Sequence, residues 1–224
     1  ISDCTFYGRG TTAFSAYNGI CHSNSGTISN CVNYSNHIRA GIASSNYGTI
    51  RDCHNYGFIS GHDASVGGIC AWNGGTVIDC TNAGEINGLS MNTGGICGSN
   101  AGMIRRCANT ATVYSSSTYT GGICGNNDGD KVLGGVIQSC YNTGSVSSSR
   151  VYVGGICGGN EGLITGCYNA GSFRSSEGSA GSICGYNTVT QVRDSTGKIT
   201  LYTNPGAVIN CISYYSSTII GQNM

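Results

Sequence analysis

The chain has 224 residues, and its ten lysines and arginines balance ten aspartates and glutamates, so the formal net charge is zero. Charged residues make up only 9% of the chain, which excludes the basic surface that a nucleic acid or an anionic membrane would need. The 38 glycines do not follow the G-X-Y period of collagen, and no apolar run is long enough to insert across a membrane.

A repeat runs through the chain almost from its start. The chain begins at Ile1 without an initiator methionine or a signal-peptide pattern, so we expect a piece of a longer protein with neighbouring modules. The first column of the repeat is the cysteine of a recurring Ile-Cys pair, at Cys21, Cys70, Cys97, Cys124, Cys157 and Cys184, with Ala43 in the one remaining place. Most neighbours in this column are 27 residues apart; the interval after Cys124 is 6 residues longer and the interval before Ala43 is 5 shorter.

Three further columns keep the same register. A second cysteine follows ten residues after the first in most repeats, at Cys31, Cys53, Cys80, Cys107, Cys140, Cys167 and Cys211, and Cys4 belongs to a truncated first turn. An asparagine stands three residues behind the first column, at Asn24, Asn46, Asn73, Asn100, Asn127, Asn160 and Asn187. Another stands two residues behind the second, at Asn33, Asn55, Asn82, Asn109, Asn142 and Asn169.

These columns predict an all-β fold, because short apolar runs alternate with Asn-x-Gly turn signals and no run is long enough for an amphipathic helix. We expect a single-stranded β-solenoid over residues 1–187, a right-handed parallel β-helix with about 27 residues per coil and seven to eight coils. Stacking would turn each asparagine column into a hydrogen-bonded ladder. The glycine beside each asparagine would supply a positive φ or a close backbone approach.

The fourteen cysteines admit two interpretations, a column of packed thiols or a set of cross-core disulfides. Ala43 favours packed thiols: a bridge within each coil would leave Cys53 without a partner, and a bridge to the next coil would leave Cys31 without one. Disulfides remain the alternative. No C-x-x-C pair is present, so we predict no metal site and no cofactor.

The pattern breaks in residues 188–224. Residues 189–201 alternate around Asp-Ser-Thr-Gly in the way a β-hairpin would, before Val208 to Cys211 resume the repeat. We expect an irregular last coil with an inserted hairpin, serving as a C-terminal cap or as an exit to the next module.

The repeat resembles the GLUG repeat of bacterial surface and secreted proteins, whose pattern is close to G-G-L-V-G-x-N-x-G-x-I-x-N-C-Y-x-x-G-x-V. Residues 154–171 read G-G-I-C-G-G-N-E-G-L-I-T-G-C-Y-N-A-G, with Cys157 in the family's Val place, and the resemblance extends from Cys4 to about Asn187. Such repeats occur in adhesin-like proteins and beside IgA-specific metallopeptidase modules, which implies an extracellular or cell-surface location. It does not imply the peptidase, because the chain has no H-E-x-x-H motif.

The residues that vary from coil to coil point to a binding surface. A polar segment rich in Ser and Tyr follows the second cysteine of each coil and lies on one edge of the predicted rod. Tyr and Ser together are typical of adaptable recognition surfaces, although they also populate exposed β-sheet. The binding candidates are Tyr114, Tyr119, Arg150, Tyr152 and Arg174.

A catalytic alternative rests on the acidic residues. Asp52 and Asp79 share one column, with Arg51 nearby, and paired carboxylates on neighbouring coils can act on a glycosidic bond. A solvated outer face with scattered opposite charges is the simpler interpretation, so we assign no catalytic residue. The sequence therefore predicts a non-enzymatic module that binds a glycan or a host or neighbouring surface protein, or acts as a spacer; the alternative is a polysaccharide lyase or hydrolase.

Overall fold

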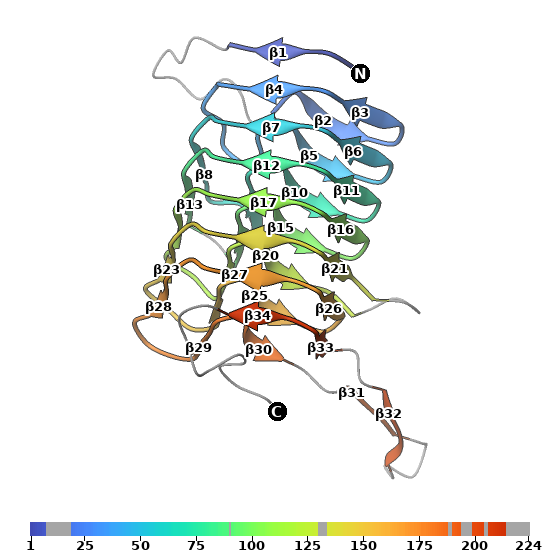
Figure 1. Ribbon diagram of the computed structural model, residues 1–224, viewed down its shortest axis with the longest axis vertical. Helices are drawn as coiled ribbons and strands as arrows, with labels where there is room; N and C mark the ends of the chain where they lie inside the picture. Colours follow the sequence, from blue (N-terminus) through green and yellow to red (C-terminus); the bar gives the residue numbers. More distant parts are fainter. Residues whose placement is uncertain are drawn as a thin grey trace.

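The computed structural model describes residues 1–7, 19–89, 91–129, 134–187, 190–193, 199–203 and 206–213. This part of the chain contains strands and no helix, and hence no helix able to span a membrane. Its strands form five parallel sheets that run along a rod, together with one separate hairpin (Figure 1). The predicted β-solenoid of seven to eight coils is confirmed, because the longest sheet has eight parallel strands and the next two have seven each.

The coils that begin at Ala43, Cys70, Cys97, Cys124 and Cys157 contribute one strand to each of the five sheets, and the coils that begin at Cys21 and Cys184 contribute strands to three of them. We number the sheets in the order in which a coil visits them from the first cysteine column. Sheet I contains β2 (Cys21–Asn24), β5 (Ala43–Asn46), β10 (Cys70–Asn73), β15 (Cys97–Asn100), β20 (Cys124–Asn127), β25 (Cys157–Asn160) and β30 (Cys184–Asn187). Sheet II contains β3 (Thr27–Ser29), β6 (Thr49–Arg51), β11 (Thr76–Ile78), β16 (Met103–Arg105), β21 (Val136–Gln138), β26 (Leu163–Thr165) and β33 (Ala207–Ile209). Sheet III contains β1 (Thr5–Phe6), β4 (Val32–Asn33), β7 (His54–Asn55), β12 (Thr81–Asn82), β17 (Ala108–Asn109), β22 (Tyr141–Asn142), β27 (Tyr168–Asn169) and β34 (Ile212–Ser213).

The other two sheets are shorter. Sheet IV contains β8 (Ile59–Gly61), β13 (Ile86–Gly88), β18 (Val113–Ser115), β23 (Val146–Ser148) and β28 (Phe173–Ser175). Sheet V contains β9 (Ser65–Gly67), β14 (Asn92–Gly94), β19 (Tyr119–Gly121), β24 (Val153–Gly154) and β29 (Ala180–Gly181). We call sheets I to III with their core the main lobe, and sheets IV and V with theirs the side lobe.

The main lobe is filled by the isoleucine and cysteine columns. Cysteines of both columns pack with isoleucines such as Ile104 and Ile123 in one buried cluster. All fourteen cysteines are free thiols, and the eleven other than Cys4, Cys21 and Cys211 are buried. Burial raises the pKa of the Cys97, Cys157 and Cys184 thiols, so they stay protonated and able to donate.

Most of the buried thiols donate a hydrogen bond to a local carbonyl. In the first column the acceptor belongs to the residue two positions later in the chain, as from Cys124 Sγ to the Asn126 carbonyl oxygen at 3.2 Å. In the second column it belongs to the residue two positions earlier, as from Cys107 Sγ to the Arg105 carbonyl oxygen at 3.3 Å. The interpretation of cysteine as a packed core residue is confirmed, and these hydrogen bonds give it a role that valine could not fill.

Both asparagine columns form the predicted ladders. Each Nδ2 up to the last asparagine of its column donates to the Oδ1 of the next coil, at 2.7–2.8 Å in the first ladder and 2.7–2.9 Å in the second. Each also donates to a carbonyl of its own turn, as Asn100 does to Gly102. The turn glycine serves close approach: a Cβ on Gly102 would lie 2.1 Å from the carbonyl oxygen of Gly75 in the coil before. The asparagine side chains thus supply hydrogen-bond donors to buried turn carbonyls that are not paired within the sheets.

The side lobe has a smaller core of its own. Ile86 and Val113 from sheet IV face Val66 and Val153 from sheet V, and Phe173 packs against them at the last coil. Thr93 Oγ1 donates to Ser115 Oγ across this core at 3.3 Å. The alternating residues of each strand therefore point away from it, toward the outside of the lobe.

The predicted hairpin is present in the tail. Strands β31 (Thr190–Arg193) and β32 (Ile199–Thr203) pair antiparallel with each other and with no strand of the five sheets. Figure 1 shows them beyond the last coil. The chain then returns to the solenoid, where Val208 pairs in register with Ile164.

Candidate binding surface

The two lobes meet where sheet V strands pack against the sheet I strand one coil further along, as β9 does against β15 and β24 against β30. Glycines allow this approach, because a Cβ on Gly98 would lie 2.6 Å from the backbone nitrogen of Val66. Outward side chains of the two strands then contact each other: Ser65 Oγ lies 2.7 Å from Ser99 Oγ, and Asn92 Nδ2 donates to Ser99 Oγ at 2.9 Å. We call this surface the seam and define it by Ser65, Asn92, Tyr119 and Tyr152 from the sheet V side and by Ser45, Trp72, Ser99, Asn126, Gly159 and Tyr186 from the sheet I side.

Three tyrosines gather at the C-terminal end of the seam. Tyr119 and Tyr152 stack with ring centroids 5.3 Å apart and ring planes 16° from parallel. Tyr186 completes the group, 4.8 Å from Tyr152 and 6.5 Å from Tyr119, with its ring tilted. All three rings are half-buried, so the group is held in place by packing while part of each ring reaches solvent.

Two local backbone features position these rings. The Tyr119 ring occupies the space beside Gly159, where a Cβ would lie 2.7 Å from Tyr119 Cδ1. Tyr152 has a φ of 60°, the left-handed region that aromatic residues rarely adopt. Its carbonyl still accepts from the Thr120 N–H at 3.1 Å, so the coil pairing is kept. Strain of this kind, roughly 1–2 kcal/mol, tends to persist at functional sites.

The seam is uncharged along its length, since its ten defining residues carry serine, asparagine, glycine and aromatic side chains. Burial raises the pKa of the Tyr119 hydroxyl, and the neighbouring Tyr152, Tyr186 and Glu161 groups add to the effect. Tyr119 therefore stays protonated and can donate a hydrogen bond.

A second aromatic pair lies further toward the N-terminus on the same outer face of sheet I. Trp72 and Tyr47 have ring centroids 5.0 Å apart, and Trp72 lies over Gly74, where a Cβ would meet the indole at 2.3 Å. Register places Trp72, Ser99, Asn126, Gly159 and Tyr186 in one column.

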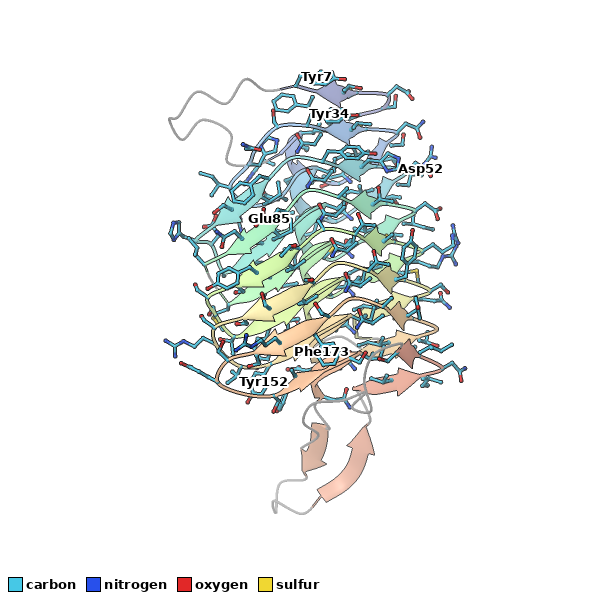
Figure 2. All side chains as sticks on the ribbon, turned by 60° about the vertical axis from the view of Figure 1, so that its left-hand side comes forward. Tyr7, Tyr34, Asp52, Glu85, Tyr152 and Phe173 are labelled. Atoms are coloured by element: carbon cyan, nitrogen blue, oxygen red, sulfur yellow. The ribbon has the colours of Figure 1, made fainter. Side chains whose placement is uncertain are left out.

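Away from the seam, Tyr7, Tyr34 and Tyr56 form an exposed stack at the N-terminal coils, with centroids 4.9 and 5.0 Å apart. Figure 2 shows Tyr7 and Tyr34 at this end of the rod. Because these rings cover each other's faces, the stack offers mainly ring edges to a ligand.

The structure brings together only two of the five binding candidates from the sequence, Tyr119 and Tyr152. Tyr114 points outward from sheet IV, on the opposite face of the side lobe, in one column with Ser147 and Arg174. Arg150 lies at the tip of the lobe, with Nη1 4.0 Å from Glu177 Oε2. Sequence analysis missed Tyr186, although the column two residues behind the first cysteine is aromatic at Trp72 and Tyr186 and polar or glycine elsewhere.

The acidic pair lies elsewhere, at the corner between sheets II and III; Figure 2 shows Asp52 and Tyr152 on opposite margins of the rod. Asp52 and Asp79 have φ values of 52° and 55°, and the residue before each second cysteine is left-handed in every described coil. Asp and Asn tolerate this conformation better than most residues. In the described coils positive φ thus recurs at this corner, and the glycines of the Asn-x-Gly turns do not adopt it.

Each of these carboxylates has an arginine partner. Asp79 accepts two hydrogen bonds from Arg106, both at 2.7 Å, and this contact lowers the pKa of Asp79. Asp52 accepts from its neighbour Arg51 at 2.9 Å. A general acid needs a raised pKa, so the geometry of Asp79 fits an ion pair at a turn better than a catalytic acid.

The chain is similar to a known protein in its fold. No family model and no curated protein sequence matches the chain. A crystal structure of a Bacteroides ovatus protein bearing the name "putative immunoglobulin A1 protease" is similar, with a TM-score of 0.55 and 21% sequence identity. The match covers 88% of this chain and 60% of that one, so the chain spans less than two thirds of that protein's length. The two share a β-solenoid architecture.

Proposed function

We propose that the chain is a non-enzymatic β-solenoid module of a bacterial cell-surface or secreted protein, and that its seam is an adhesive, ligand-binding surface. The observation that carries the proposal is the group formed by Tyr119, Tyr152 and Tyr186. Rings from three coils meet there at a strained residue, although neither the ladders nor the cores need them.

Two likenesses support the extracellular setting. The repeat resembles the GLUG pattern of surface and secreted proteins, and the fold is shared with a protein named for a protease of immunoglobulin A1. The protease activity in that name is not extended to this chain, whose four histidines are in no H-E-x-x-H motif.

A surface-binding assay tests the proposal. Purified protein is applied to immobilised glycans and host matrix proteins, and we expect saturable binding that Tyr186→Ser weakens about tenfold. Serine already occupies this column at Ser99, so the substitution should preserve the fold. Tyr114→Ser, on the opposite face of the side lobe, is the matched control and should bind as the unmodified protein does.

Two other results would replace the proposal. Absence of saturable binding to every surface would identify the rod as a mechanical spacer. Cleavage of a polysaccharide that disappears in Asp52→Asn would establish the carbohydrate-active alternative, with Asp79 and Arg51 as its other residues.

A further inference from the structure

We infer that the ligand of the seam is a linear, uncharged oligosaccharide that lies along the rod axis between Trp72 and the three tyrosines. This inference rests on the proposed function and narrows it to one ligand class, one direction and a minimum length. It follows from the spacing, the chemistry and the charge of the seam.

The spacing sets the direction and the length. Trp72 and Tyr186 stand in one column of sheet I, four register steps apart. Parallel strands are about 4.8 Å apart, so Trp72 and Tyr186 are separated by roughly 19 Å along the rod. The Tyr119 ring lies beside Gly159, one step nearer to Trp72. A single sugar ring cannot contact both groups, whereas an extended chain of sugar rings along the axis can.

A polar side chain between the aromatic groups suits sugar hydroxyls. Asn126 lies between them in the sheet I column at a half-buried position. Ser99, next to it in the column, is buried and already bonded to Ser65 and Asn92, so the Asn126 amide is the group left for a ligand. Amides and hydroxyls donate and accept hydrogen bonds, and the negative faces of aromatic rings attract the C–H groups of a pyranose. A small number of polar groups among aromatic ones is the usual composition of a binding site for an organic ligand.

An extended peptide fits the seam less well. Peptides that bind along a sheet add a strand to an open edge. The seam lies on the outer faces of sheets I and V, where strands such as β15 and β19 already pair on both sides. Side chains alone are therefore available to the ligand.

Charge favours a neutral glycan over an acidic one. None of the ten residues that define the seam carries a positive charge to pair with a uronate or a sulfate, so an anionic chain would lose hydration there without gaining an ion pair.

A titration series tests the inference. Disaccharides and hexasaccharides of β-1,4-linked glucose, mannose and xylose, with galacturonic acid oligomers as the anionic comparison, are titrated into the protein by calorimetry. For at least one neutral series we expect the hexasaccharide to bind about tenfold more tightly than the disaccharide, because it alone reaches both aromatic groups.

Two variants separate the ends of the seam. Trp72→Ala should weaken hexasaccharide binding about tenfold and leave disaccharide binding unchanged, and Tyr186→Ala should weaken both. Tyr114→Ala is the control and should change neither. The urea midpoint of each variant is measured first, so that loss of binding is not confused with loss of fold.

The outcomes separate this inference from the proposed function. Equal affinity for both lengths, tighter binding of galacturonic acid oligomers, or no effect of Trp72→Ala would overturn the inference. Binding of a matrix protein that Tyr186→Ala weakens would overturn it too, while leaving the seam as an adhesive surface. Absence of binding to any glycan or protein would overturn both.

Discussion

The main lobe and the side lobe stack on the same coil spacing, but they use their residues differently. In the main lobe the inward columns hold cysteine, isoleucine and asparagine in nearly every coil, and each copy hydrogen-bonds or packs with the next. In the side lobe the inward columns are less uniform, because valine and isoleucine share the core with Thr93, Ser115 and Thr120. Its outward column changes from Ser65 to Asn92 to Tyr119.

This difference separates stability from recognition. A ladder needs identical residues, because each amide must find the same partner one coil away. A recognition surface needs different residues at defined heights along the rod. Both kinds of column run next to each other in sheet I. Asn127 and Asn160 are buried in the ladder, while Asn126 and Gly159, each one residue earlier, belong to the column on the outer face.

The largest expected effect comes from breaking the main lobe's ladder. Asn100→Ala leaves Asn73 Nδ2 and Asn127 Oδ1 without their buried partners and removes the bond to the Gly102 carbonyl. We expect the free energy of unfolding to fall by about 3 kcal/mol. Urea unfolding followed by circular dichroism measures it.

Asn126→Ala is the matched control, the same substitution on the same side of the rod at a half-buried position of the seam. Its cost should stay within about 0.5 kcal/mol. Equal costs for the two variants would show that the ladder is not what stabilises the main lobe.

A smaller effect is expected from the thiol columns. Cys97→Ala removes one buried atom and its contacts from a fully buried position, and should lower the free energy of unfolding by about 1 kcal/mol. Cys4→Ala, at an exposed position of the first coil, should change it by less than about 0.5 kcal/mol. Similar midpoints for both variants would contradict a packed role for the column.

Two substitutions of Asp79, in the corner before the second cysteine, distinguish the effect of the left-handed backbone from that of the ion pair with Arg106. Asp79→Ala keeps the left-handed φ of 55° with a residue that tolerates it poorly, so we expect a loss of about 1 kcal/mol. Asp79→Asn tolerates the conformation and loses only the exposed pair with Arg106, so its cost at pH 7 should be smaller. Equal urea midpoints for the two variants would remove the backbone argument.

The pH dependence of Asp79→Asn has a defined sign. The folded-state pKa of Asp79 is lowered by the hydrogen bond from Arg106, so the pair stabilises the protein above the ordinary value of 3.8. That contribution is lost as the pH falls through the lowered pKa. The difference in urea midpoint between the unmodified protein and Asp79→Asn should therefore shrink toward pH 2; a difference that grew on acidification would contradict it.

Much of the main lobe could be predicted from the sequence, because its contacts repeat with the coil. Residues 27 apart, such as Asn73 and Asn100, become register partners, so a column with this period predicts which residues contact each other. The hairpin before Ala207 could also be predicted, because its alternation is local.

The seam could not be predicted in this way, because its contacts follow a different separation. Ser65 meets Ser99 and Tyr152 meets Tyr186, each 34 residues apart, which is one coil plus the return from sheet V to sheet I. That offset depends on how the side lobe folds back against the main lobe. Tyr119 and Tyr152 could be selected for their composition, but nothing in the repeat connects them to Tyr186.

The most direct test of this separation of stability from recognition is a triple variant that combines Tyr119→Asn, Tyr152→Asn and Tyr186→Ser. It gives these positions the residues that other coils carry in the same columns, at Asn92 and Ser99. Its affinity for neutral hexasaccharides is measured by calorimetry beside its urea midpoint. We predict loss of binding with a fall in stability well below that of Asn100→Ala. Retained binding, or a loss of stability as large as that of the ladder variant, would contradict the separation of recognition from the repeated columns.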